Sequence, residues 1–243
     1  MNPFIDAVLL ALREVDGALN NTSNTTLLDS FSIGEGGDVS SGFDLLAESI
    51  FFNHLSPFGS LYSEESGWMS PQSDTIIILD PIDGSDNFSS FFPYYGVAVS
   101  REVSSKTTDA VVCNLANGDI FIRTDSEYYK TSLQNSLIKE EVKITLHPKI
   151  GLFEKAHEHP FLGEKLIQNG LKYRSPGAVA LSLAYAPYVK YMLFLGTMRK
   201  FDIDAGLFLS QHLYCFYDSR YILISSSKEV FIQMRNIVEK EYF

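Results

Sequence analysis

The sequence predicts a mixed α/β fold in which layered sheets are covered by helices. The chain has 243 residues, of which 45% are hydrophobic and 20% charged, and this is enough to close one substantial core. Helical and strand periodicities alternate along the whole chain, and both hairpin-linked and isolated strands occur. No repeat, low-complexity tract or long linker divides it. We therefore expect one unit, residues 1–243, built from two tightly packed halves of about residues 1–126 and 127–243.

The first half combines two helices with a series of strands. Phe4, Val8 and Leu12 recur at helical intervals, so residues 3–20 are expected to form an amphipathic helix. A polar, glycine-rich stretch follows, and helical spacing returns over residues 43–55. Strand patterns then occur at residues 75–79, 95–103, 108–116 and 118–124. Asn117 and Gly118 form the expected tight turn of the last hairpin.

The second half mixes further strands with helices. Strand patterns occur at residues 149–154, 190–196 and 221–227. Helical patterns occur at residues 161–169, 177–186, 204–213 and 228–240. This alternation predicts that a second sheet lies between helices.

Charge argues against several classes of partner. The formal net charge is −11 and the pI is near 4.9, so a nucleic-acid polymer would be repelled. The first 20 residues carry Asp6, Arg13, Glu14 and Asp16 among apolar residues, which is typical of neither a signal peptide nor a membrane span. We expect a cytoplasmic protein whose partner is a small molecule rather than a membrane.

The stretch TIIILDPIDGSDNF, residues 75–88, places two carboxylates at the end of an apolar strand. Asp80 and Asp83 are expected just past that strand, with Pro81 fixing a bend that points both the same way. Clustered carboxylates repel one another unless a cation lies between them or one holds a raised pKa. Gly84 to Asn87 resemble a helix start, whose N–H groups could bind phosphate. This stretch thus suggests a divalent metal beside a phosphate.

Two other interpretations of the stretch remain. Asp-Pro and Asp-Gly are also common in turns with no catalytic role. A second class of phosphatases ends an apolar strand in aspartates two residues apart, one of which attacks phosphorus covalently. Here the acids stand three apart, which favours a metal-activated water over an aspartyl-phosphate intermediate.

The motif DPIDGSDNF resembles the signature of the inositol monophosphatase family of lithium-sensitive, Mg²⁺-dependent sugar phosphatases. Three more blocks occur in the family's order: DVSSGFD at 38–44, SEES at 63–66 and FDIDAG at 201–206. The resemblance implies a layered αβαβα sandwich, two or three Mg²⁺ ions per site, inhibition by lithium and a homodimer.

The resemblance also implies a ligand set for the metals. Glu64, Asp80 and the carbonyl of Ile82 would hold one Mg²⁺, and Asp80, Asp83 and Asp202 a second. A third ion would lie near Asp44 and Glu64. Mg²⁺ prefers hard oxygen ligands in near-octahedral geometry, and these residues supply them. Asp202 could alternatively, or additionally, cap the helix that follows, and Asp204 is expected to face solvent in its first turn.

Catalytic and substrate-binding roles are implied in the same way. Ser41, Asp44 and Glu64 would polarise the attacking water, and Ser85 would touch that water or the phosphate. Gly84 and Ser85 would offer backbone N–H groups to the phosphate, beside Asp83 and Asp202.

The sugar-binding positions depart from the inositol-specific pattern. Ala178 stands where a serine is expected, and Leu195 stands where a glutamate binds ring hydroxyls. A sugar hydroxyl left unpaired against Leu195 would lose about 1 to 3 kcal/mol, so myo-inositol phosphate is not the expected natural substrate. Cations lie nearby, either for a second phosphate or only for solubility: Arg174, Arg199 and Lys200.

These observations predict a Mg²⁺-dependent phosphomonoesterase that hydrolyses a small sugar or inositol phosphate by a metal-activated water. Fructose 1,6-bisphosphate and 3′-phosphoadenosine 5′-phosphate are the candidate substrates with a second phosphate. The alternative is a regulatory protein of the same fold that acts by contacting a protein partner.

Overall fold

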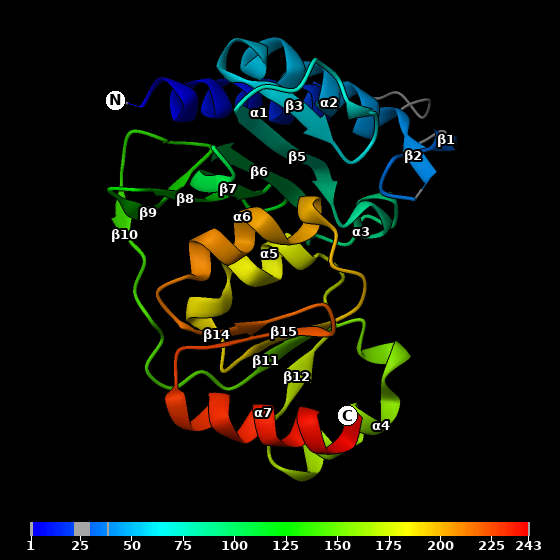
Figure 1. Cartoon of the computed structure of the whole chain (residues 1–243), viewed down its shortest axis with the longest axis vertical. Coiled ribbons are helices and arrows are strands. Elements are labelled where there is room, and N and C mark those ends of the chain that lie inside the picture. The colour runs from blue at the N-terminus through cyan, green and yellow to red at the C-terminus, as the bar shows by residue number, and fades with distance from the viewer. Residues whose placement is uncertain (1, 22–29, 38, 243) are drawn as a thin grey trace.

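The computed structural model describes residues 2–21, 30–37 and 39–242, and these residues form five layers (Figure 1). Two helices cover a large sheet, a second pair of helices separates it from a smaller sheet, and a third pair covers the far side. This is the αβαβα sandwich that the sequence predicted. Asp38, which opens the block at 38–44, lies outside the described residues, as does 22–29 of the polar stretch.

Most helices begin and end within about two residues of the predicted bounds, but α6 begins four residues before the predicted 204, and no bounds were predicted for α3. The helices are α1 (Pro3–Asn21), α2 (Gly42–Leu55), α3 (Ser85–Ser89), α4 (Pro160–Gln168), α5 (Val179–Ala184), α6 (Lys200–Ser210) and α7 (Lys228–Tyr242). The face of α1 that carries Phe4, Val8 and Leu12 is fully buried, as its helical periodicity requires.

Within the described residues, eight strands form the large sheet in the order β10-β9-β8-β7-β6-β5-β3-β4. Their bounds are β3 (Ser60–Ser63), β4 (Gly67–Trp68), β5 (Thr75–Asp83), β6 (Gly96–Val103), β7 (Lys106–Asn114), β8 (Asp119–Thr124), β9 (Tyr128–Ser132) and β10 (Glu140–Glu141). Only β3 and β5 pair in parallel among these neighbours. That one parallel pair brings the carboxyl ends of two strands to the same edge of the sheet.

The smaller sheet has the order β12-β11-β13-β15-β14 within the described residues. Its strands are β11 (Gly151–Glu154), β12 (Tyr173–Arg174), β13 (Met192–Leu195), β14 (Tyr214–Tyr217) and β15 (Tyr221–Ser225). A separate ladder pairs β1 (Ser30–Ile33) with β2 (Val39–Ser41).

Apolar clusters fill each space between layers. One joins α1 and α2 to the large sheet, and a second joins that sheet to α5 and α6. A third lies between α5, α6 and the smaller sheet, and a fourth lies beneath α4 and α7. Because α5 and α6 pack on both sheets, the second half of the chain can deliver side chains to the large sheet.

Several local predictions need correction. The strand expected at 75–79 continues to Asp83, so Asp80 and Asp83 lie within its end rather than past it. The expected turn at Asn117 and Gly118 exists, but the loop between β7 and β8 has four residues, 115–118. The expected division near residue 126 falls inside the large sheet, because β9 and β10 still pair with their neighbours there. The chain passes to the smaller sheet between residues 142 and 150.

Candidate metal centre

Glu64 reaches the site through the parallel pairing of β3 and β5. Ser63 at the end of β3 pairs with Leu79, and the N–H of Glu64 donates to the carbonyl of Leu79 over 3.0 Å. Glu64 therefore begins the turn after β3 directly beside Asp80 on the neighbouring strand. Residues 16 apart in the sequence are brought together by the register of two short strands.

Asp80 and Asp83 reach the same side of the sheet because the strand is irregular between them. In a regular strand, residues three apart point to opposite faces. Here Asp80 pairs with Ala98 but Asp83 pairs with Gly96, so three steps on β5 match two on β6. Such a bulge adds one residue and returns the second side chain to the first face. Pro81 lies in this irregular segment, where a missing N–H costs no ladder hydrogen bond.

Asp202 comes from the first turn of α6, which packs against β5 and β6. Asp202 is the third residue of the helix, and Arg199 occupies the N-cap position. Asp202 is therefore not the N-cap that the sequence allowed. The helix α6 belongs to the second half of the chain and lies against the large sheet (Figure 1), and the carboxylate of Asp202 lies near that of Asp80 in β5.

Ser41 and Asp44 form a capping box at the start of α2. The Ser41 N–H donates to Asp44 Oδ2 over 2.6 Å, and the Asp44 N–H donates to Ser41 Oγ over 3.3 Å. Asp44 Oδ1 is buried with no hydrogen-bond partner in the described part of the chain. The box fixes both side chains and leaves one carboxylate oxygen of Asp44 for a ligand.

The four central carboxylates are buried and repel one another. Glu64, Asp80, Asp83 and Asp202 are between 2% and 9% exposed. Burial, and then the charges of Glu64, Asp83 and Asp202, raise the pKa of Asp80 well above its usual value. Burial raises the pKa of Glu64 to about 7, although Arg199 acts to lower it.

These carboxylates fit a divalent cation. Oxygens of Glu64, Asp80 and Asp202 all lie within 4.8 Å of one another. Asp80 Oδ1 is buried with no hydrogen-bond partner among the described residues, and a buried polar atom of this kind calls for a ligand. Hard carboxylate oxygens without histidine or cysteine suit Mg²⁺ better than a softer metal. Ile82, whose carbonyl the sequence assigned to a metal, is buried in the bulge between Asp80 and Asp83.

Asp83 is held in a slightly different way from the other three. Its Oδ2 accepts a 2.7 Å hydrogen bond from the N–H of Leu181 in α5, and burial, against the opposing effect of that bond, raises its pKa well above the usual value. Its carboxylate interacts electrostatically with Asp202 and Glu64. Asp83 thus belongs to the cluster and also joins β5 to α5.

The segment after Asp83 packs against the turn before α5. Gly84 has φ of +86° and caps α3, and a Cβ at this position would lie 3.0 Å from the Cβ of Ala178. Asn87 Nδ2 donates to the carbonyls of Tyr94 and Pro176, each over 2.7 Å. Ala178 therefore lies beside the signature segment, in which Ser85 is the first residue of α3. Glycine is required at position 84 because the backbone there is in the left-handed region and the signature segment closely approaches the turn before α5.

Glu154 is part of this arrangement and was missed by the sequence analysis. Its buried carboxylate accepts a 2.9 Å hydrogen bond from the N–H of Gly177 and a short one from Ser182 Oγ. Burial raises its pKa, against the lowering effect of these hydrogen bonds. Glu154 is the last residue of the apolar strand β11, as Asp83 is of β5, but it belongs to none of the four sequence blocks that marked the other carboxylates.

The structure shows the surroundings of two residues that the resemblance assigned to the substrate. Leu195 is 2% exposed and belongs to the core beneath α4 and α7, so its apolar side chain packs the fold instead of facing a sugar. Arg174 is exposed on β12 and its Nη1 donates to the carbonyl of Tyr173 over 2.8 Å.

The remaining cations and Asp204 are already engaged. Lys200 Nζ contacts Glu102 Oε1 at 2.9 Å and Asp204 Oδ2 at 3.9 Å. The side chain of Asp204 is only 17% exposed, so the expectation that it faces solvent was wrong, and burial raises its pKa to about 6. Arg199, in contrast, contacts both Asp202 and Glu64, which places it in the metal centre rather than beside it.

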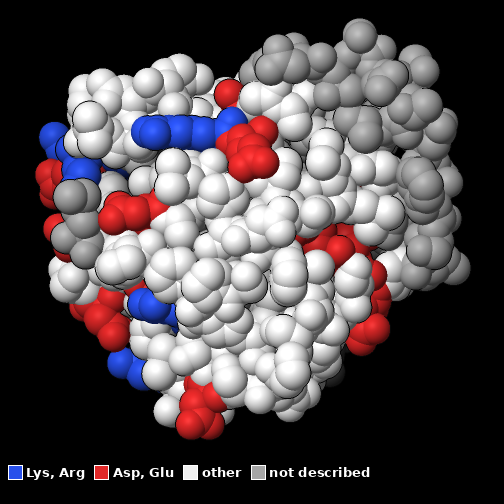
Figure 2. All heavy atoms as spheres, turned by 90° about the horizontal axis from the view of Figure 1, so that it is seen from above, with Lys and Arg blue, Asp and Glu red and all other residues white. Residues whose placement is uncertain are grey.

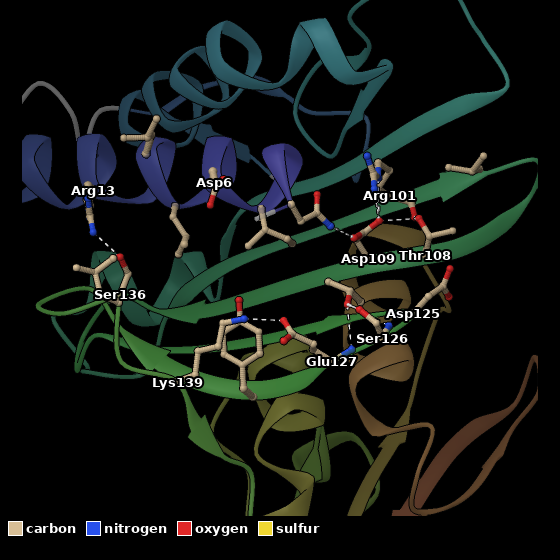
Figure 3. Close-up of a pocket in the computed structure, with 18 residues that line it drawn as sticks. Asp6, Arg13, Arg101, Thr108, Asp109, Asp125, Ser126, Glu127, Ser136 and Lys139 are labelled. Atoms are coloured by element: carbon tan, nitrogen blue, oxygen red, sulfur yellow. Dashed lines mark hydrogen bonds and ion pairs between the residues drawn. The ribbon is translucent and has the colours of Figure 1, made fainter.

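A separate hollow of about 1040 Å³ lies between α1 and the ends of strands β6 to β9 (Figure 3). Its charged groups are largely paired: Arg101 forms an ion pair with Asp109, and Lys139 contacts Glu127 at 2.6 Å. None of the four carboxylates of the metal centre lines it. Its size alone therefore does not make it the reactive site.

Charge on the surface over α1 and α2 is mixed. On the face seen in Figure 2, blue side chains lie apart from one another and several adjoin acidic groups. This distribution, with the net charge of −11, does not favour a polyanion. Among the described residues, no helix is both long enough and apolar enough to cross a membrane.

The fold and the carboxylate centre agree with the comparison to known families. The model of the inositol monophosphatase family matches residues 36–211, which is more than half of the chain. The chain therefore belongs to the inositol monophosphatase family, as its signature motif indicated.

Relatives within this family carry two kinds of name. The chain is 25% identical over 183 residues to a fructose-1,6-bisphosphatase of Pyrococcus furiosus, an alignment that covers 71% of this chain and 69% of the relative. It is 23% identical over 217 residues to the Nus factor SuhB of Escherichia coli, covering 85% and 81%. The name of one relative is enzymatic, and that of the other is not.

Solved structures share the fold over its whole length. The extragenic suppressor protein suhB of Bartonella henselae superposes with a TM-score of 0.77 at 19% identity, covering 99% of this chain and 98% of that one. An IMPase of Thermotoga maritima gives a TM-score of 0.76 at 18% identity, covering 97% and 98%. At these identities the likeness establishes the fold alone.

Proposed function

We propose that this protein is a Mg²⁺-dependent phosphomonoesterase that hydrolyses a small sugar or inositol phosphate. The observation that carries the proposal is the convergence of Glu64, Asp80, Asp83 and Asp202, buried and mutually repelling, from three separate parts of the fold. Structural ion-pair networks rarely keep so many carboxylates together against one guanidinium. Membership of the inositol monophosphatase family supports the same conclusion.

The side chains divide the work as follows in this proposal. Glu64, Asp80 and the Ile82 carbonyl would hold one ion, Asp80, Asp83 and Asp202 would hold a second, and Asp44 with Glu64 would hold a third. When bound, Mg²⁺ supplies Lewis acidity and a bound water of lowered pKa.

The chain's own groups then orient the reactants. The capping box orients the Ser41 hydroxyl and leaves Asp44 Oδ1 without a partner in the described part of the chain, and in this proposal these groups and Glu64 would polarise the attacking water. Ser85 is the first residue of α3, and we assign its hydroxyl to the same water or to the phosphate. The backbone N–H groups of Gly84 and Ser85 are assigned to phosphate oxygens.

Substrate choice follows from what borders the signature segment. Ala178 contributes a methyl group where a hydroxyl is found in inositol-specific relatives, and Leu195 is withdrawn into the core. Neither supplies a hydrogen bond to an inositol ring. We therefore favour a sugar bisphosphate such as fructose 1,6-bisphosphate, which is also the substrate named for the relative from Pyrococcus furiosus.

The test is release of inorganic phosphate from three compounds: fructose 1,6-bisphosphate, inositol 1-phosphate and 3′-phosphoadenosine 5′-phosphate. Each is assayed with Mg²⁺, with EDTA and with Mg²⁺ plus Li⁺. We expect Mg²⁺-dependent, Li⁺-sensitive turnover that Asp83→Asn abolishes, while Asp86→Asn, an exposed acid three residues along, changes it little. Turnover in EDTA, or full activity of Asp83→Asn, would exclude the metal-dependent mechanism.

A second candidate function rests on the relatives named Nus factor SuhB, which align over most of the chain. In that case the fold and the metal centre would persist while the biological role lay in contacting a protein partner. Measured Mg²⁺ binding without hydrolysis of any phosphomonoester in a broad panel would favour it. The homodimer implied by the family resemblance is proposed as well, and sedimentation equilibrium tests it directly.

A further inference from the structure

Arg199 lies inside the carboxylate cluster rather than at its edge. Its Nε and Nη2 donate to the two carboxylate oxygens of Asp202 over 2.8 and 3.0 Å. Its Nη1 contacts Glu64 Oε1 at 3.0 Å. The guanidinium, 29% exposed, thus pairs with two of the three residues whose oxygens can converge on one metal ion.

The guanidinium and a divalent ion need the same oxygens. Both oxygens of Asp202 and one of Glu64 accept from Arg199, and the fork geometry of arginine makes such bidentate pairs strong. A cation at this point would also be repelled by the fixed positive charge a few ångströms away. Arg199 does stabilise the ionised form of Glu64, since it acts to lower the pKa of that carboxyl against burial.

Arg199 also joins the cluster to the segment 34–37. Its Nη1 donates to the carbonyl of Gly36 over 2.7 Å, and the N–H of Gly36 donates to the carbonyl of Glu64 over 2.7 Å. A Cβ on Gly36 would lie 2.5 Å from Glu64 Cγ, so this segment rests directly on the Glu64 side chain. Movement of the guanidinium would therefore change the position of segment 34–37.

We propose that Arg199 is an internal counter-cation of the metal centre, which a divalent ion must displace from Glu64 and Asp202 in order to bind. This inference rests on the metal site of the proposed function. It predicts that the metal-free protein is stabilised by Arg199 and that metal affinity is lowered by the same residue. Loading of the centre is thereby coupled to release of the segment 34–37.

The chain contains its own reporter for that release. Its single tryptophan is Trp68, and the ring of Trp68 lies 4.8 Å from that of Tyr62. Tyr62 in turn contacts Glu35 Oε1 through its hydroxyl at 3.5 Å. A shift of segment 34–37 should therefore change the emission of Trp68.

The test is direct titration with Mn²⁺, followed by the electron paramagnetic resonance of the free ion, and with Mg²⁺ by calorimetry, both at pH 8. Arg199→Met keeps the aliphatic stem and removes the charge. Lys200→Met is the matched control, because the neighbouring Lys200 pairs with Glu102 and Asp204 outside the cluster. Arg199→Lys keeps a charge that cannot reach both carboxylates as a fork, and it serves if the methionine variant folds poorly.

We expect Arg199→Met to bind either ion at least about tenfold more tightly than the wild type, with Arg199→Lys in between and Lys200→Met unchanged. The metal-free Arg199→Met protein should melt below the wild type. Metal should change Trp68 emission in the wild type and less in the variant.

Equal or weaker metal binding by a folded Arg199→Met or Arg199→Lys variant would overturn the inference. If the variants give that result while the wild type binds metal and hydrolyses a phosphomonoester, only the proposed role of Arg199 is wrong. If the wild type binds neither ion, the proposed metal-dependent function falls with it.

Discussion

Replacing Asp80 by Asn should stabilise the metal-free protein while removing its metal binding. Asp80 is the most buried of the four central carboxylates, at 2% exposure, and it interacts unfavourably with Glu64, Asp83 and Asp202. The amide has nearly the same shape and carries no charge. The substitution therefore relieves repulsion in the metal-free protein and takes away a ligand from the loaded one.

The size of the stabilisation can be worked from the cluster geometry. Two unit charges 4.8 Å apart, the outer limit for oxygens of Glu64, Asp80 and Asp202, repel by about 3 kcal/mol at an effective dielectric constant of about 20. Protonation of Asp80, whose pKa is raised, and the charge of Arg199 reduce that figure. We expect a gain of roughly 1 to 3 kcal/mol at pH 8, or about 2 to 4 °C in Tm per kcal/mol for a chain of this length.

The assay is thermal unfolding at pH 8 in EDTA and again in saturating Mg²⁺. The wild type should melt higher in Mg²⁺ than in EDTA, whereas Asp80→Asn should melt at nearly the same temperature in both and above the wild type in EDTA. Asp86→Asn, exposed in the same segment, should behave as the wild type does. A lower Tm of Asp80→Asn in EDTA, or an undiminished rise with Mg²⁺, would refute the view that this cluster is a metal site held against repulsion.

Three further outcomes are expected. Burial raises the pKa of Glu64 from 4.5 to about 7, so the contribution of this group to stability is complete below about pH 4.5 and is lost as the pH rises through about 7. In EDTA, the free energy of unfolding measured with urea should therefore fall by up to about 3 kcal/mol between pH 5 and 8 because of Glu64. A rise over that range would contradict the assignment. Ser182→Ala removes the hydroxyl that donates to the buried Glu154 and should lower the free energy of unfolding by about 1 to 3 kcal/mol. The measurement is urea unfolding, with the exposed Ser89→Ala as the control. Equal unfolding midpoints for the two variants would show that the Glu154 contact contributes nothing to stability. Gly84→Ala places a side chain at a residue with φ of +86°, and its Cβ would lie 3.0 Å from that of Ala178. This substitution should lower both Tm and Mg²⁺ affinity by displacing the end of β5. The control Gly17→Ala, whose Cβ would meet open space within α1, should lower neither.

Much of the fold was predictable because its elements are marked by local periodicity. The apolar spacing of residues 3–20 and the continuous run at 75–79 mark a helix and a strand whichever way the rest of the chain is arranged. The short strands β3 and β4 carry no such signal, since two to four residues cannot show a period. Yet the pairing of β3 with β5 is what brings Glu64 to Asp80.

The carboxylates of the site were likewise predictable as residues but not as an arrangement. The spacing of Asp80 and Asp83 was read as a bend after the strand, whereas an irregular register inside the strand turns both to one side. The family resemblance assigned Leu195 to a sugar-binding position, and in the structure this residue is buried in the core beneath α4 and α7. The spacing of residues along the chain does not determine which layer a side chain faces, because that depends on how the strand pairs with its neighbouring strands.

The amino-acid sequence by itself determined the layered α/β class, the signature segment and the oxygen ligands available for a hard cation. Only the tertiary structure decided that Glu154 fastens the turn before α5 and that Arg199 lies among the carboxylates. The physical reason is that periodicity and motif spacing are local properties of the chain. Which charges meet in a buried place depends on contacts between separate segments, such as those of Glu154 with Gly177 and of Glu64 with Arg199, and these contacts form only when the layers pack.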